Sequence, residues 1–175
     1  MIKFIWRIAS AHTIAYFIAG LFAITFLNYD ELFNVGDLSF MRSTDSPWVA
    51  AGPGLQIVKG IVLGLVLYSF RAIFLETKYG WFKFGVLLFG LSYVLTLSAA
   101  VGSFEGLIYT NIPLKTHLNG LSEVILYTLL FSVILWLWYR KESKLINILS
   151  IVLTAIIVFL SIMGVLAATG LVEVN

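Results

Sequence analysis

The stretch LINILSIVLTAIIVFLSIMGVLAA, residues 145–168, decides the fold class of this chain. It contains no charged residue, and it is about as long as the roughly 20 residues that an α-helix needs to cross a bilayer. Backbone polar groups in hydrocarbon must be satisfied internally, so a continuous apolar segment fits a helix better than the alternating strand of a barrel. The sequence therefore predicts a transmembrane helix here.

Further apolar segments of spanning length precede it, at about residues 4–27, 53–75, 81–101 and 118–139. The chain is 61% hydrophobic and only 11% charged, against about 25% charged in a typical soluble domain. So few charges cannot cover a water-soluble surface. We expect an all-α integral membrane protein, one domain over residues 1–175 with five transmembrane helices and two long loops at 28–52 and 102–117.

Charged residues near the ends of the predicted helices divide unevenly between the two sides. One side carries eight basic and two acidic residues, namely Lys3, Arg7, Arg71, Lys78, Lys83, Arg140, Lys141, Lys144, Glu76 and Glu142. The other carries two basic and six acidic residues, namely Arg42, Lys115, Asp30, Glu31, Asp37, Asp45, Glu105 and Glu173. Because basic residues accumulate in cytoplasmic segments, we expect a cytoplasmic N-terminus, with both long loops and the C-terminus outside.

Composition also excludes several kinds of chemistry. The chain has no cysteine, which rules out disulfides, thiolate metal sites and a cysteine nucleophile. With only two histidines a conventional zinc site is not expected either, and we predict no metal and no cofactor. The basic residues are few and scattered, so nothing indicates nucleic acid. No motif in the chain names a reaction or a family.

One basic and one acidic residue, Lys59 and Glu123, remain within the predicted membrane spans. Counted from the outer ends of the second and fourth spans, each lies roughly 8–9 Å deep. An isolated charge at a helix centre costs about 2.5–3.5 kcal/mol on insertion scales, and pairing offsets that cost. We therefore predict that the second and fourth spans touch and that Lys59 meets Glu123, either as a structural clasp or as a proton- or ligand-responsive pair.

Polar residues accompany this predicted pair. Gln56 lies three residues before Lys59, and Asn119 lies four before Glu123, spacings that share a helix face. Both outer loops run into these spans and bring further polar residues to the same membrane surface. The predicted site comprises Gln56, Lys59, His117, Asn119 and Glu123, and its predicted outer lid comprises Arg42, Asp45, Glu105 and Lys115. Ordinary solvated loops are the alternative interpretation.

His12 is predicted to lie apart from that site, in the cytoplasmic half of the first span. Thr13 and Tyr16 are its polar neighbours, and a hydrogen-bonded interior histidine is weighed against a proton-relay role. Gly60 and Gly64, spaced four apart in the second span, permit close helix approach, with Ala15 and Ala19 in the first span. That pattern is a packing device.

Three functions are consistent with these features. The first is a small membrane protein that binds or transports a small ligand or ion through an outward-facing polar site, with proton linkage. The second is an accessory or assembly subunit of a larger membrane complex, or a homo-oligomer. The third, a membrane enzyme acting on a lipid or headgroup at the outer interface, is the least favoured, so we do not expect enzyme activity. The expected location is the cell membrane, the inner one in a Gram-negative bacterium.

Overall fold

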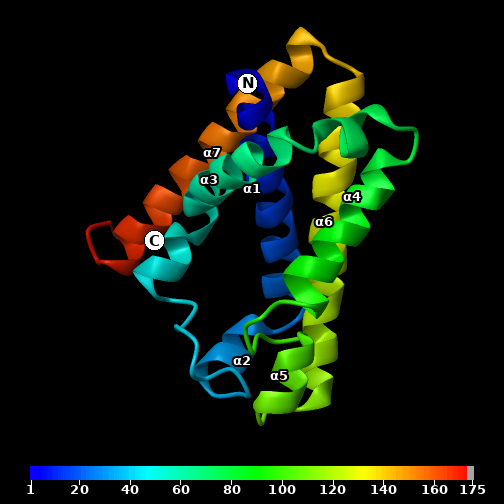
Figure 1. Ribbon diagram of the computed structural model, residues 1–175. Coiled ribbons are helices and arrows are strands. Elements are labelled where there is room, and N and C mark those ends of the chain that lie inside the picture. Colours follow the sequence, from blue (N-terminus) through cyan, green and yellow to red (C-terminus); the bar gives the residue numbers. More distant parts are fainter. Residues whose placement is uncertain (173–175) are drawn as a thin grey trace.

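The computed structural model describes residues 1–172, and these fold into helices without any strand (Figure 1). Glu173, which the charge division assigned to the outer side, lies outside the described residues. Four helices are long and apolar enough to cross a membrane. In chain order the elements are α1 (Ile2–Phe26), α2 (Tyr29–Asn34), α3 (Pro47–Tyr68), the π-helical turn η1 (Ala72–Glu76), α4 (Gly80–Phe89), the π-helical turn η2 (Gly90–Val94), α5 (Phe104–Tyr109), α6 (Leu114–Arg140) and α7 (Lys144–Ala168).

Helix α1 is the centre of the bundle. It packs against α3, α6 and α7, while α3 pairs with α7 on one side and α4 pairs with α6 on the other. Figure 1 shows α1 between these two helix pairs, with α2 and α5 together at one end. Helix α1 is the most buried of the four long helices, whereas α3 and α7 expose long rows of leucine, isoleucine and valine. Exposed apolar faces of this size are expected where lipid is the solvent.

The third predicted span is the main difference from the sequence prediction. Instead of one helix over 81–101, α4 continues into η2, and the helix ends at Val94. The chain then folds back, because the Ser103 hydroxyl donates to the carbonyls of Ser98 and Ala100 and accepts from the Gly106 N–H. Gly102 takes a left-handed conformation at φ 83°, which a residue with a side chain adopts only rarely.

The second span also begins earlier than predicted. Helix α3 starts at Pro47, six residues before the expected start at Pro53, and Pro53 lies inside the helix. Proline suits the first helical position because its missing N–H would be unpaired there in any case. The earlier start places Lys59 deeper along α3 than the sequence count indicated.

A glycine contact joins α1 to α3. A Cβ atom at Gly60 would lie 2.6 Å from the Ala9 Cα, and one at Gly64 would lie 3.0 Å from the Ile5 Cα. The two backbones therefore approach as closely as glycine allows. The predicted close approach is present, but Ala9 and Ile5 take the place of Ala15 and Ala19.

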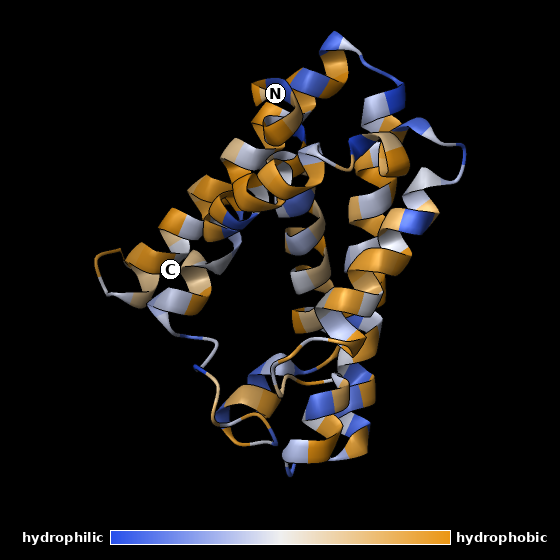
Figure 2. Cartoon of the chain, in the orientation of Figure 1, coloured by the Kyte–Doolittle hydropathy of each residue, from blue (hydrophilic) through white to orange (hydrophobic). Residues whose placement is uncertain are grey.

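An apolar core lies beside this contact, in the half of the bundle that holds the N-terminus. It is built from Phe4, Ile8, Ala11, Ala15, Leu67, Leu75, Phe84, Leu88, Phe131 and Leu135. Edge-to-face aromatic contacts hold it together, with the Phe84 and Phe131 rings 5.2 Å apart. Figure 2 shows hydrophilic residues concentrated at the two ends of the molecule and apolar residues along the helices between them.

Candidate functional site

A buried histidine at the centre of the bundle links three helices. His12 on α1 has no exposed surface. Its Nδ1 lies 2.7 Å from the Tyr127 hydroxyl on α6, and its Nε2 lies 3.1 Å from Gln56 Oε1 on α3. Because the amide oxygen of Gln56 can only accept, Nε2 carries the proton and Nδ1 accepts from the phenol. The Gln56 amide nitrogen donates to the Gly52 carbonyl at 3.4 Å, which agrees with this orientation.

A carboxylate lies one helical turn from that histidine group. Glu123 and Tyr127 are four residues apart on α6, a rise of about 6 Å, and so share a face. His12 and Tyr16 have the same spacing on α1, which packs against α6. The centroids of the His12 and Tyr16 rings lie 6.3 Å apart.

Helix α2 closes the end of this arrangement that is remote from the N-terminus (Figure 1). The Tyr29 hydroxyl donates a hydrogen bond to the Glu123 carboxylate. Tyr29 follows Asn28, whose left-handed backbone (φ 52°) turns the chain sharply from α1 into α2. Burial, and secondly the Glu123 charge, raise the pKa of the Tyr29 phenol above its usual value. The phenol is therefore protonated at neutral pH and acts as the donor.

We call Gln56, His12, Tyr127, Tyr16, Glu123 and Tyr29 the polar row. It consists of two hydrogen-bonded groups, one around His12 and one around Glu123, with Tyr16 between them. Three tyrosine side chains and one glutamine side chain thus surround His12 and Glu123. Protonation of either group changes which neighbours donate and which accept, so the row can couple a proton to the positions of α1, α2, α3 and α6.

The predicted pair of Lys59 and Glu123 does not form. The two ion pairs found within residues 1–172 both use Glu142, and Lys59 is exposed on α3. Helix α6 packs mainly on α1 and α4, whereas α3 packs on α1 and α7, so α1 intervenes. The similar predicted depth of Lys59 and Glu123 therefore did not mean that α3 and α6 are in contact at these residues. Gln56 instead bonds to His12, which the sequence prediction had placed apart from it.

The remaining predicted ligand-binding residues lie further out on α6. His117 is buried, its Nδ1 accepts from the Gly102 N–H at 2.6 Å, and its carbonyl accepts from the Tyr93 hydroxyl at 3.0 Å. The ring thus holds the loop after η2 against α6. Its Nε2 is buried without a hydrogen-bond partner in the described part of the chain. Asn119 is exposed and forms no side-chain hydrogen bond there.

The four predicted lid residues are scattered, since Arg42 and Asp45 precede α3, Glu105 lies on α5 and Lys115 lies in the first turn of α6. Arg42 lies over the Trp48 ring at 5.6 Å, and Asp45 and Lys115 are exposed. Glu105 is half-buried on α5, with one carboxylate oxygen unpartnered among residues 1–172. No hydrogen bond or ion pair within those residues joins any of the four to Glu123. Nor does one link Asp45, Glu105 and His117, the acid–base set that an enzyme at the outer interface would need.

Asp30 in α2 and Asp37 in the segment after it form hydrogen bonds in this region, and none of the four predicted lid residues takes part in them. Asp30 accepts from the Thr44 hydroxyl at 2.5 Å and from the Asn34 amide at 2.9 Å, and Asp37 accepts from the Thr116 hydroxyl on α6. Sequence reasoning missed Tyr29 and Tyr127 as site residues. The spacing of four between Glu123 and Tyr127 was the available signal, since polar residues at that distance share a helix face.

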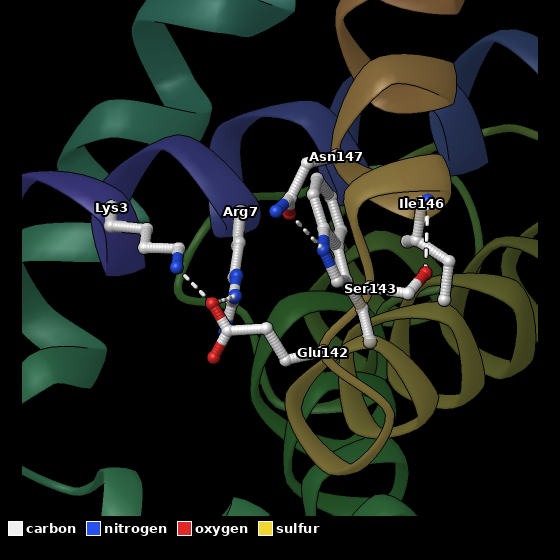
Figure 3. Close-up of polar contacts among 7 residues, drawn as sticks. Lys3, Arg7, Glu142, Ser143, Ile146 and Asn147 are labelled. Atoms are coloured by element: carbon white, nitrogen blue, oxygen red, sulfur yellow. Dashed lines mark hydrogen bonds and ion pairs between the residues drawn. The ribbon is translucent and has the colours of Figure 1, made fainter.

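A separate polar group joins the ends of α1 and α6 at the N-terminal end of the bundle (Figure 3). Lys3 and Arg7 both form ion pairs with Glu142, and the Arg7 Nη2 lies 2.8 Å from the carboxylate. Arg7 is buried and lies over the Trp138 ring at 5.8 Å. The Trp138 Nε1 donates to the Asn147 Oδ1 of α7 at 2.9 Å, so this group also fixes the turn between α6 and α7.

Among residues 1–172 no group of three or more histidine, aspartate or glutamate side chains is arranged to hold a metal ion. Comparison with known proteins does not assign the chain to a family, since no family model, curated protein or solved structure matches it. The function must therefore be argued from the polar row itself.

Proposed function

We propose that the chain is a multi-pass protein of the cell membrane, with its N-terminus in the cytoplasm and α2 and α5 outside. The four long apolar helices and the uneven division of charge support this orientation. The segments counted as cytoplasmic also meet at one end of the bundle, where Tyr139 and Arg140 of α6 bond to Glu76 of η1. In this topology α4 and η2 return the chain to the outer side.

We infer that the protein binds or transports a small ligand or ion with proton linkage, through the polar row. The observation that carries this inference is His12, a titratable group without exposed surface, hydrogen-bonded by side chains from two other helices. Ionisable residues inside a bilayer are unfavourable and commonly mark pathways or sites. A second one, Glu123, lies one turn away along α6 and is closed off by Tyr29 of α2.

The proposed coupling follows from the hydrogen-bond roles. When Glu123 takes up a proton from the outer side, its carboxyl gains a donor and loses acceptor strength, so its bond to the Tyr29 phenol weakens. Helix α2 is then released from α6. When His12 is protonated, both ring nitrogens become donors, and Tyr127 must turn its hydroxyl proton away from the ring. That proton then points along α6, where Glu123 is the next acceptor.

The natural lack of cysteine makes this proposal directly testable. Cysteines introduced at the exposed Glu31 of α2 and the exposed Ser122 of α6 carry spin labels whose separation reports opening of α2. Between about pH 8 and pH 4, a range that includes the ordinary pKa values of glutamate and histidine, we expect the distance distribution to shift towards longer values. Glu123→Gln should abolish this shift, because its side chain does not titrate.

Asp45→Asn is the matched control, since it removes an exposed carboxyl on the same side of the bundle. It should leave the response to pH unchanged. A shift of equal size in Glu123→Gln would contradict proton linkage through the polar row. It would favour the accessory-subunit alternative, in which the polar side chains only hold helices together.

A further inference from the structure

An apolar groove lies between α4 and α6, and its volume is about 250 Å³. The α4–α6 groove is lined chiefly by Trp81, Val86 and Phe89 of α4 and by Ile125, Leu129 and Ser132 of α6. Two hydroxyls in its lining, those of Thr128 and Ser132, donate to carbonyls of α6 at 2.8 and 2.5 Å. They offer no free hydroxyl proton to a ligand, so the groove suits a hydrocarbon chain.

The α4–α6 groove points towards the end of the bundle that holds the N-terminus. Ser132, Trp136 and Arg140 follow one another at intervals of four and therefore lie along one face of α6. The Trp136 Nε1 donates to the Thr77 carbonyl at 3.4 Å, so this tryptophan reaches the turn that precedes α4. Arg140 is the last residue of α6, where the helix leaves the bundle.

Two basic side chains lie at this end of the groove. The Arg140 guanidinium lies 5.2 Å from the centroid of the Trp136 ring, one helical turn back towards the groove. Lys78 is exposed and follows Thr77 in the turn that Trp136 contacts. Both ion pairs within residues 1–172 use Glu142, and neither includes Arg140 or Lys78. The two cations therefore have no carboxylate partner in the described part of the chain.

We propose that the α4–α6 groove binds an anionic phospholipid, with its phosphate at Arg140 and Lys78 and an acyl chain along the groove. Charge complementarity identifies the headgroup as an anion, and a guanidinium matches the oxygens of a phosphate. Basic pockets between helices at a membrane surface bind anionic phospholipids in this way.

The direction of the groove agrees with this ligand. Tryptophans gather at the headgroup level of a membrane, and both Trp81 and Trp136 lie at the basic end of the groove. From there the lining continues along α6 through Leu129 to Ile125, towards the bilayer centre. In the proposed orientation the lipid belongs to the cytoplasmic leaflet. This proposal goes beyond the proposed function and uses its membrane orientation, but not proton linkage in the polar row.

A photoreactive phosphatidylglycerol tests the proposal. The protein is reconstituted in vesicles of neutral phosphatidylcholine that contain a small fraction of phosphatidylglycerol with a diazirine in one acyl chain. After irradiation, labelled peptides are identified by mass spectrometry. Labelling should concentrate on residues 81–89 and 125–132, which line the groove, and unlabelled phosphatidylglycerol should displace the probe. The same diazirine on phosphatidylcholine should label these segments no more than it labels the exposed face of α7.

Charge variants test the headgroup site. Lys78→Gln and Arg140→Gln should each reduce labelling about fivefold through loss of one basic residue near the membrane surface. Arg140→Lys keeps the charge and should keep most of the labelling. Lys144→Gln is the matched control, since it removes an exposed cation at the start of α7, at the same end of the bundle. It should leave labelling unchanged.

A second pair of variants tests the groove. Leu129 lines the groove and is 48% exposed, so Leu129→Trp should fill it and reduce labelling without disturbing the core. Leu137 on the same helix is 43% exposed but lies outside the lining, and Leu137→Trp should have no such effect.

Three results would overturn the proposal. The first is undiminished labelling when Lys78→Gln and Arg140→Gln are combined. The second is equal labelling of the groove by the phosphatidylcholine probe, which would make it an unselective surface for any lipid chain. The third is an equal effect of Leu129→Trp and Leu137→Trp. Because none of these readouts uses α2 opening, their outcome is independent of that of the proposed proton linkage.

Discussion

Helix α1 contacts α3 and α6 in two different ways. Against α3 it presents Ala9 and Ile5 to Gly60 and Gly64, and the contact is made by close approach of two backbones. Against α6 it presents His12, and the contact is made by a side-chain hydrogen bond. In lipid both packing and hydrogen bonds hold helices together, but only the second kind changes when a proton is added. The first contact holds the two helices at a fixed separation, and the second is the one that protonation of His12 would alter.

The largest effect is expected at the glycine contact. In Gly60→Ala the new Cβ meets the backbone of Ala9, so the helices must separate, and we expect a loss of about 3 kcal/mol in the free energy of unfolding. Unfolding in mixed detergent and dodecyl sulfate micelles measures it. Gly52→Ala on the same helix meets nothing within 4 Å and should be neutral or slightly stabilising. Equal effects of both changes would contradict the close approach.

Replacing His12 should lower the free energy of unfolding less than Gly60→Ala does, but it should impair the proposed function more. His12→Leu leaves the Tyr127 hydroxyl and the Gln56 amide oxygen without partners, at a cost of about 2 kcal/mol. A double-mutant cycle with Tyr127→Phe should give a coupling energy near 0.6 kcal/mol, the average for such bonds in membrane bundles. Zero coupling would mean that the bond contributes nothing to the contact.

Removing the Tyr29 hydroxyl should have a smaller effect, which decreases at low pH as Glu123 takes up a proton and is constant from about pH 8 to pH 9. Tyr29→Phe deletes the bond to Glu123, and we expect it to cost about 1 kcal/mol. Because the pKa of Tyr29 is raised in the folded state, ionisation of the phenol does not reduce this contribution below the unfolded value of about 10 and removes it only as the pH rises through the folded value. The free energies of unfolding of both proteins, measured between about pH 6 and pH 9, test this. A difference that falls steadily as the pH rises across that range would be inconsistent with it.

The smallest effect is expected at the ion pairs of Glu142. Its side chain is 51% exposed, so solvent screens the interaction, and Glu142→Gln should cost less than about 1 kcal/mol. The cost should shrink in high salt. A loss as large as that of Gly60→Ala would show that this end of the bundle, rather than the glycine contact, holds α1 in place.

These contacts also show which parts of the fold the sequence could predict. Of the five apolar segments predicted to span the membrane, four form long apolar helices, and the spacing of Gly60 and Gly64 predicted a close approach. The predicted partners Ala15 and Ala19 were wrong, because spacing does not fix the register between two helices. The predicted third span was too long, since its last residues are apolar but are held in a loop by Ser103 and His117. The hydropathy of a segment does not reveal local hydrogen bonds of that kind.

Prediction of the site failed for a related reason. When depth in the membrane was counted from Pro53, Lys59 and Glu123 came out at the same level, but α3 begins at Pro47. Depth also does not determine which face of a helix a residue lies on. His12 was placed apart from Gln56 by the same kind of count, although the two side chains are bonded. Tyr29, which closes the carboxylate, comes from a short helix in a loop where no periodicity points to it. To predict the site correctly, one would need to know how each helix is rotated about its own axis, and the sequence pattern did not provide this.

The central claim is that the Glu123 carboxyl exchanges a proton while hydrogen-bonded to Tyr29. Infrared difference spectroscopy of the reconstituted protein between about pH 5 and pH 8 measures this directly, through the C=O stretch of a protonated carboxyl. We predict a band that appears at the lower pH, is absent in Glu123→Gln, and shifts its midpoint to higher pH in Tyr29→Phe, which lacks the donor that stabilises the charged form. An identical band in the wild type and in Glu123→Gln would contradict the claim.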